Sequence, residues 1–220
     1  MTEEEQLLKI KTEYADNLKR ITDMAYIMGH DCKAHLEAGQ DSQNQIARRA
    51  YVRSVFAFIE GIIFGMKQTS TYLGGPTGRL DIKELIAITE KTIEINGKGE
   101  AFEKPAFTRF VDNFKFTFRV FGKCHSSDFA PDLNTKGWSK LQDAIKVRDR
   151  LMHPKETSDL EVSNSELEAA KIAFDWFFIN HALSSLEAGK AVKLKLSAPA
   201  EEIAESNEKI SDLKRGLLEL

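Results

Sequence analysis

Apolar residues recur at helical spacing over long stretches of this chain, and this spacing limits its fold more than any other feature. Between residues 3 and 37 they fall every three or four positions among charged residues, at Leu7, Leu8, Ile10, Tyr14, Leu18, Ile21, Met24, Ala25 and Met28. Such a period places them on one face of an amphipathic helix. A second helix is expected to follow the polar stretch 39–42 and to run to about Met66, with a wide apolar face made by Val55, Phe56, Ile59, Ile62, Ile63 and Met66. That width predicts a central, buried helix.

Further helices are expected between the glycine-rich breaks. Asp81 follows the loop 74–78 and is a candidate N-cap for a helix through about Ile95. After the break 96–99, Pro105 suits the first turn of another helix, in which apolar residues form a stripe at Phe107, Phe110, Val111, Phe114, Phe118 and Phe121. We interpret this stripe as core rather than as a platform for stacking nucleic-acid bases.

Two more helices complete the expected bundle. One contains Trp138 and stops near His153, because Pro154 disfavours helical geometry in the residue before it. Ser163 or Ser165 with a following Glu would cap the last large helix, which is expected to end at about Glu187. Residues 191–196 alternate like a short strand, and a last amphipathic stretch follows Pro199. The fold class predicted from these patterns is all-α, an up-and-down helical bundle.

Composition and charge exclude several classes of protein. The chain has 220 residues, of which 42% are hydrophobic and 30% charged, as in a folded globular protein rather than a disordered one. A net charge of −3 argues against a large basic surface for nucleic acid, so any RNA contact must be local. We expect no signal peptide, no membrane-spanning segment and no disulfide framework from two lone cysteines, and hence a cytoplasmic protein.

One charged residue interrupts the apolar pattern of the helix that contains Trp138. Positions 138, 141, 145, 148 and 152 are spaced as a seam, and Arg148 is the one charge in it. A guanidinium on such a face needs a carboxylate, a phosphate or a solvent-filled cleft. His153 lies five residues on and shares a face with Arg148 only if the helix ends there, as Pro154 indicates.

The run from Arg148 to His153 resembles the signature of the HEPN superfamily, in which Arg is followed by Asn, Asp or His and a final His comes about one to two helical turns later. Members are helical bundles found among toxin–antitoxin, abortive-infection and CRISPR-associated ribonucleases. The resemblance implies one HEPN-like domain over residues 1–190, with a core at about 40–68 and 135–188 and an insertion at about 70–125. The N-terminal helix and a tail at 191–220, with a short helix, would be additions.

The resemblance also implies metal-independent RNA cleavage without a cofactor, in which a ribose 2′-hydroxyl attacks the adjacent phosphate and leaves a 2′,3′-cyclic phosphate. Histidine exchanges protons readily near neutral pH, so His153 fits a general acid or base. Arg148 would clamp the non-bridging phosphate oxygens as charge develops on them. Asp149 matches the family's polar position and would orient Arg148 or His153.

Partners follow from the same resemblance. Family members commonly form homodimers in which two motifs face one cleft, so a homodimer is expected, with an antitoxin or regulatory protein as a further partner. Local positive charge for RNA would come from Lys146, Arg150 and Lys155. A second candidate basic patch is formed by Arg48, Arg49 and Arg53.

Each of these functional interpretations has a structural alternative. Arg148 could simply pair with Glu60, the carboxylate on the most apolar helix, and the chain would then be a non-catalytic module for dimerisation or partner binding. RNA binding without cleavage is a third, weaker reading. The cluster His30, Asp31, Cys32 and His35 offers too few ligands for the metal sites that proteins usually build, so no metal is expected.

Overall fold

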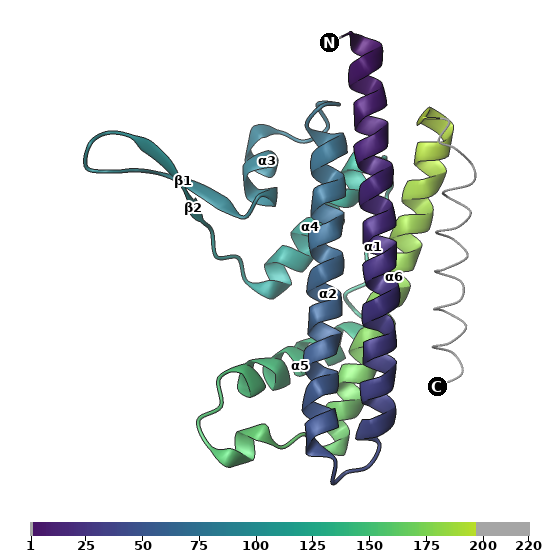
Figure 1. Cartoon of the computed structure of the whole chain (residues 1–220), viewed down its shortest axis with the longest axis vertical. Coiled ribbons are helices and arrows are strands. Elements are labelled where there is room, and N and C mark those ends of the chain that lie inside the picture. Colours follow the sequence, from purple (N-terminus) through teal and green to yellow (C-terminus); the bar gives the residue numbers. More distant parts are fainter. Residues whose placement is uncertain (1, 197–220) are drawn as a thin grey trace. The chain divides into compact units, whose positions relative to one another are not determined.

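The computed structural model describes residues 2–196 and shows the predicted helical bundle (Figure 1). Within these residues, six α-helices, one short 3-10 helix and a two-stranded antiparallel sheet follow one another in the order α1 (Glu3–Gly39), α2 (Gln45–Gly74), α3 (Ile82–Ile88), β1 (Lys91–Ile95), β2 (Ala101–Pro105), α4 (Phe110–His125), α5 (Lys136–Met152), η1 (Thr157–Leu160) and α6 (Asn164–Leu196). None of the described helices is both long and apolar enough to cross a bilayer. The amphipathic stretch expected after Pro199 lies outside the described residues.

The described residues form two compact units, and three long helices contribute to both. One unit comprises residues 2–18, 63–130 and 184–196, and the other comprises residues 19–62 and 131–183. Helices α1, α2 and α6 therefore each supply one segment to each unit. The expected extent of one HEPN-like domain, 1–190, stays a prediction.

The unit that contains α5 is built around aromatic packing between α2 and α6. Phe58 of α2 is fully buried and lies 5.0 Å from Phe174 and 6.2 Å from Phe177, measured between ring centroids. Helix α5 packs closely on α6 at Gly137, where an added Cβ would stand 2.2 Å from the ring of Trp176. The expectation that α2 is central and buried is confirmed, since its predicted apolar face is at most 3% exposed.

The other unit has its own apolar core. Its buried residues come from α1, the end of α2, the loop before α3, α3 and α4, namely Tyr14, Leu73, Leu80, Ile88, Val120 and Cys124. The chain folds back so tightly after α2 that only glycine fits at position 74: a Cβ there would stand 2.4 Å from Cγ of Leu80. Asp81 caps α3 as predicted: its carboxylate accepts from the backbone N–H groups of Lys83 and Glu84.

The structure corrects the predicted helices between residues 82 and 110. Helix α3 ends at Ile88, and the stretch expected to continue it contains strand β1, in which three of the five residues are β-branched. Pro105 ends strand β2 instead of opening a helix. Because α4 begins only at Phe110, Phe107 is 95% exposed, whereas Phe114, Phe118 and Phe121 are buried as predicted.

The last helix is longer than expected at its C-terminal end. The Oγ of Ser163 accepts from the backbone N–H of Glu166, and the Glu166 carboxylate accepts from the backbone N–H of Ser163, which is the predicted capping box. Residues 191–196 belong to α6, so the strand expected there is wrong. A short alternation of apolar and polar residues did not outweigh continuation of an established helix.

Candidate functional site

Helix α5 carries the predicted site, and its buried face differs from the expected seam. The helix begins with Thr135 as N-cap and buries a face made by Trp138, Leu141, Ala144, Val147 and Leu151. Ile145 is half-buried and Met152 is 55% exposed, so the line through 145, 148 and 152 borders the buried face. Arg148 therefore lies at the edge of the packing and does not interrupt it.

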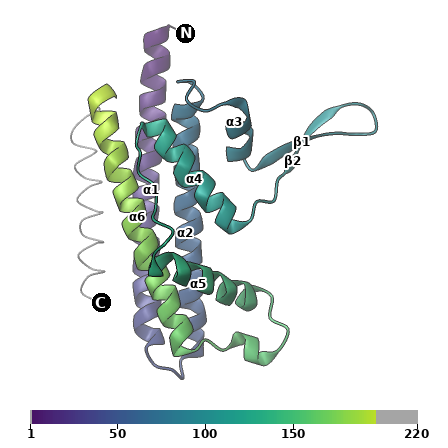
Figure 2. The same cartoon turned by 180° about the vertical axis from the view of Figure 1, so that it is seen from behind.

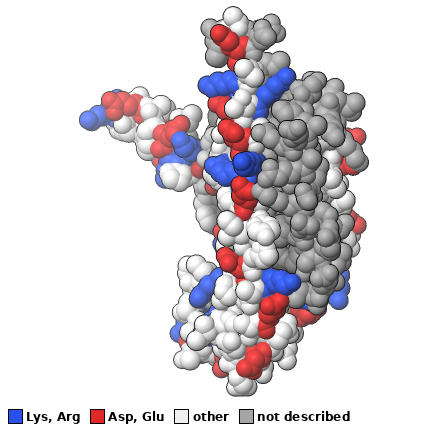
Figure 3. Space-filling view, turned by 45° about the vertical axis from the view of Figure 1, so that its right-hand side comes forward, with Lys and Arg blue, Asp and Glu red and all other residues white. Residues whose placement is uncertain are grey.

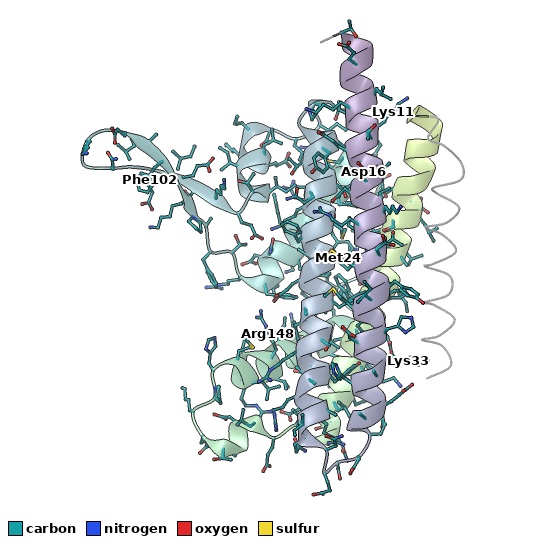
Figure 4. All side chains as sticks on the ribbon, viewed as in Figure 1. Lys11, Asp16, Met24, Lys33, Phe102 and Arg148 are labelled. Carbon is teal, nitrogen blue, oxygen red and sulfur yellow. The ribbon has the colours of Figure 1, made fainter. Side chains whose placement is uncertain are left out.

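The guanidinium of Arg148 is held from three directions, with 28% of its side chain exposed. Its Nη2 forms an ion pair with the Glu60 carboxylate of α2, which confirms the predicted pair, and its Nη1 donates to Asp149 at 3.2 Å. The guanidinium carbon lies 5.5 Å from the centre of the Phe56 ring, within range for a cation–π contact. Figure 4 shows Arg148 reaching from α5 toward α2.

His153 stands at the end of the same helix and is exposed. It is the C-cap residue, and its backbone N–H donates to the carbonyl of Asp149 at 3.1 Å, so α5 ends where Pro154 predicted. Within residues 2–196, no hydrogen bond or ion pair engages the imidazole, and none joins it to Arg148. The structure thus brings Arg148, Glu60 and Asp149 together and leaves His153 open to solvent about one and a half turns further along the chain.

Arg150, predicted to bind substrate, is engaged by the loop after α5. Its Nη1 donates to the backbone carbonyls of Ser158, Asp159 and Glu161, and its Nη2 forms an ion pair with Glu166 at 2.7 Å. The guanidinium therefore ties this loop to α5 and to the start of α6. Its positive charge is thus largely compensated by groups of the protein itself.

The two lysines predicted to contact RNA are on the surface. Lys146 is well exposed and lies 3.3 Å from Asp143, whose pKa is lowered by hydrogen bonds from Lys140 and Lys146. Lys155 is exposed as well, and its backbone N–H donates to Asp159 at 2.7 Å. Both lysines lie within seven residues of Arg148 in the sequence. Their ammonium groups therefore remain candidates for contacts with a phosphate backbone.

The second predicted basic patch does not form as a surface. Arg48 is 2% exposed, and its guanidinium donates to the carbonyls of Gly39 and Val162 and to Oδ1 of Asn164 at 2.7–2.9 Å. Arg49 donates to the carbonyl of Leu160 at 3.0 Å, and only Arg53 is exposed. Because a buried guanidinium needs acceptors, Arg48 serves to join the end of α1 to the start of α6.

A cavity of about 660 Å³ that the sequence did not reveal lies beside Arg48, and Arg148 is not among its lining residues. Residues of α1, the loop after it, α2 and α6 line it, among them Leu36, Gln40, Arg48, Asn164, Leu167 and Lys171. Its lining holds both signs of charge, since Glu37 and Glu168 also border it. No sequence pattern signalled it, because its walls come from segments more than a hundred residues apart.

The other candidate ligands are used structurally. Burial raises the pKa of the Cys32 thiol to about 12, with a further contribution from Asp31, and Nδ1 of His35 is hydrogen-bonded to Oγ of Ser54 at 2.9 Å. In the part of the chain that the structure describes, no three carboxylate, imidazole or thiol groups come together in a way that could hold a metal ion.

Comparisons with family models, with curated proteins and with solved structures found no match. The resemblance to the HEPN superfamily therefore rests on the run from Arg148 to His153 and on its position at the end of a bundle helix.

Proposed function

We propose that the chain is a metal-independent, HEPN-like endoribonuclease whose site is the C-terminal end of α5. The observation that carries the proposal is the state of Arg148: its guanidinium is fixed by Glu60, Asp149 and Phe56 and still has 28% of its side chain exposed. A pre-positioned, solvent-reachable guanidinium is what a developing phosphate charge requires. His153 supplies an exposed imidazole on the same helix end.

The proposed reaction needs no further reactant. The ribose 2′-oxygen forms a bond to the neighbouring phosphorus, the bond from phosphorus to the 5′-oxygen breaks, and the product ends in a 2′,3′-cyclic phosphate. One proton leaves the 2′-hydroxyl and one reaches the 5′-oxygen, and His153 transfers one of them. Arg148 retains its Nε–H and one N–H on each terminal nitrogen for the non-bridging oxygens, because its observed bonds use one N–H of each.

The carboxylates beside Arg148 make this role specific for arginine. Glu60 and Asp149 each accept from a different terminal nitrogen, which leaves the planar fork oriented by two bonds. A lysine at this position has a single ammonium group and cannot hold both carboxylates and present a second pair of donors. Arg148→Lys should therefore lose cleavage although the charge is conserved.

The experiment is a cleavage assay on RNA in the presence of EDTA, with analysis of the product ends. We expect wild-type protein to leave 2′,3′-cyclic phosphates and both His153→Ala and Arg148→Ala to lose this activity while still unfolding cooperatively. His30→Ala is the matched control, since it removes another exposed imidazole, on α1. Equal cleavage by His153→Ala and wild-type protein would remove the proposed site.

The Arg148–Glu60 pair favours one competing function, a non-catalytic module for dimerisation or partner binding. In that case both groups would serve packing alone. It predicts that no RNA is cut under any buffer condition and that Arg148→Ala and Glu60→Gln weaken assembly equally. Cleavage by the wild-type protein that depends on His153 would contradict it.

The cellular setting is part of the same proposal. We place the protein in the cytoplasm as a toxin or antiviral-defence effector that acts on RNA, as a homodimer and under control by an antitoxin or regulatory protein. Expression of the wild-type chain in a bacterial host should arrest growth, and His153→Ala should relieve the arrest. Arrest by both variants alike would contradict the toxin role.

A further inference from the structure

The β1–β2 hairpin is the most exposed ordered element of its unit. Every residue of β2 and four of the five residues of β1 are exposed. The hairpin extends away from α3 and α4 in two opposite views (Figures 1 and 2), and Phe102 lies on it, clear of those helices (Figure 4). A two-stranded hairpin with neither face covered is marginally stable in water, so a partner for it is expected.

The base of the hairpin is anchored by side-chain and backbone bonds, unlike that of a flexible surface loop. Glu90 adopts a left-handed backbone conformation with φ of 55°, and its carboxylate pairs with Lys67 of α2, which is 4% exposed. Asn113 of α4 donates to the same carboxylate at 3.1 Å, and these bonds lower the pKa of Glu90. The backbone N–H of Ala106 donates to the Glu90 carbonyl at 2.8 Å, so the start of β1 and the end of β2 are held together at the base.

The register leaves the two outer edges of the hairpin unequal. Backbone bonds join 90 to 106 and 96 to 100, and because bonded pairs alternate in an antiparallel ladder, 92 pairs with 104 and 94 with 102 through hydrogen bonds. The N–H groups of Lys91, Ile93 and Ile95 therefore point outward from β1. On β2 the outward positions are 101, 103 and 105, and Pro105 has no N–H to offer. The edge of β1 is open, and that of β2 is blunted.

One face of the hairpin carries two exposed isoleucines beside a charged pair. Ile93 is 59% exposed and Ile95 is 74% exposed, and the register places both on the face that also carries Ala101 and Pro105. Lys91 and Glu103 form an ion pair on this same face, with Glu103 directly opposite Ile93, and Lys104 pairs with Glu94 at 3.0 Å on the opposite face. Figure 3 shows acidic and basic side chains side by side along the hairpin.

We propose that β1 pairs antiparallel with β1 of a second copy of this chain, centred on Ile93, to form a four-stranded sheet in the order β2–β1–β1–β2. In this register Ile93 opposes the partner's Ile93, Lys91 opposes the partner's Ile95, and Thr92 opposes the partner's Glu94. No like charges stand directly opposite each other, and the four isoleucines lie in one diagonal row across the two β1 strands. This self-complementarity is the reason for assigning the edge to a second copy and not to an unrelated strand.

The same geometry limits the assembly to two chains. After pairing, both outer edges of the sheet are β2 strands, and each carries Pro105 at an outward position. A two-fold pairing of this kind is closed, so it does not propagate into fibres. The inference concerns the hairpin unit alone and does not depend on the proposed nuclease activity.

A single introduced cysteine tests the register. Cys32 and Cys124 are buried, so Ile93→Cys adds the one exposed thiol among the described residues. Directly opposed Cα atoms in a hydrogen-bonded antiparallel pair lie about 5.5 Å apart, within disulfide range. We expect mild oxidation with copper–phenanthroline to link Ile93→Cys chains into covalent dimers. Ile95→Cys is the matched control, because its two thiols would start roughly 13 Å apart along the strands and should link far less.

A measurement of mass in solution completes the test. Sedimentation of the wild-type chain should show dimers, and Ile93→Lys, which opposes two ammonium groups at the two-fold axis, should raise the dimer dissociation constant by about tenfold or more. Ile82→Lys, at an isoleucine of α3 that is 72% exposed, should leave it unchanged. A monomeric wild-type chain, an unchanged constant for Ile93→Lys, or equal linking of the two cysteine variants would overturn the inference. RNA cleavage is measured separately, so either proposal can fail alone.

Discussion

His125 and His153 both stand at the C-terminal end of a helix, and their surroundings are opposite. His125 ends α4 and is 1% exposed; its Nδ1 lies 2.7 Å from the carbonyl of Phe121 and its Nε2 lies 3.1 Å from the hydroxyl of Tyr14. Since a carbonyl only accepts, Nδ1 carries the proton and Nε2 accepts from Tyr14. His153 ends α5 with only its backbone engaged by α5. The first imidazole is buried and held by two partners, and the second is exposed to solvent.

The largest expected effect on stability comes from the pH dependence of the His125 contribution. Burial lowers the pKa of His125 from 6.5 to about 4, so between these values the unfolded chain binds a proton that the folded chain does not. The free energy of unfolding should therefore fall as the pH drops from 6.5 to 4, by about 3 kcal/mol in total for this group, and level off below that range. Chemical denaturation at a series of pH values measures it. Burial lowers the pKa of His181 to about 4 as well, so His125→Gln should make the curve shallower but not flat. His153→Ala should leave the curve unchanged, and an unchanged curve for His125→Gln would contradict the prediction.

Removal of the Tyr14 hydroxyl should have a somewhat smaller effect. Tyr14→Phe leaves the buried Nε2 of His125 without its donor, which should lower the free energy of unfolding by about 1–2 kcal/mol. Tyr72→Phe, at a half-buried tyrosine of the same unit, serves as the control. Equal stability of Tyr14→Phe and wild-type protein would show that the bond contributes nothing.

The ion pair beside the candidate site should contribute little to stability. Glu60 and Arg148 are partly exposed, so a double-mutant cycle with Glu60→Gln and Arg148→Ala should give a coupling of about 0.5 kcal/mol, reduced further by salt. Thermal unfolding of the four proteins provides the numbers. A coupling of several kcal/mol would mean that the pair is chiefly structural, and the contrast with the buried polar groups of the other unit would disappear.

The smallest expected change is that of His153→Ala, since its exposed side chain has no bond within residues 2–196 to lose. Its free energy of unfolding should stay within about 0.5 kcal/mol of the wild-type value. Parallel denaturation curves for this variant and for His30→Ala check this. A clear loss of stability in His153→Ala alone would place the imidazole in a packing role.

The long helices were predictable because a period of three to four residues persists over many turns, and one altered position does not hide it. The hairpin was missed for the opposite reason: its five-residue strands are too short to show a period, and Pro105 fits a helix start as well as a strand end. The Arg148–Glu60 pair was found because each is a charge within or beside an otherwise apolar pattern. The role of Arg48 was not predicted, because its acceptors come together only in the folded chain; they belong to Gly39, Val162 and Asn164.

The central claim is that the exposed imidazole at the end of α5 transfers a proton during RNA cleavage. The most direct measurement compares single-turnover cleavage by the wild-type protein, His153→Ala and His125→Gln, in EDTA, with identification of the 3′ ends. The account predicts cyclic phosphate ends from the wild-type protein, a rate on the order of a hundredfold or more lower for His153→Ala, and a rate close to wild type for folded His125→Gln. Cleavage that persists in His153→Ala, or that is lost only in His125→Gln, would contradict it.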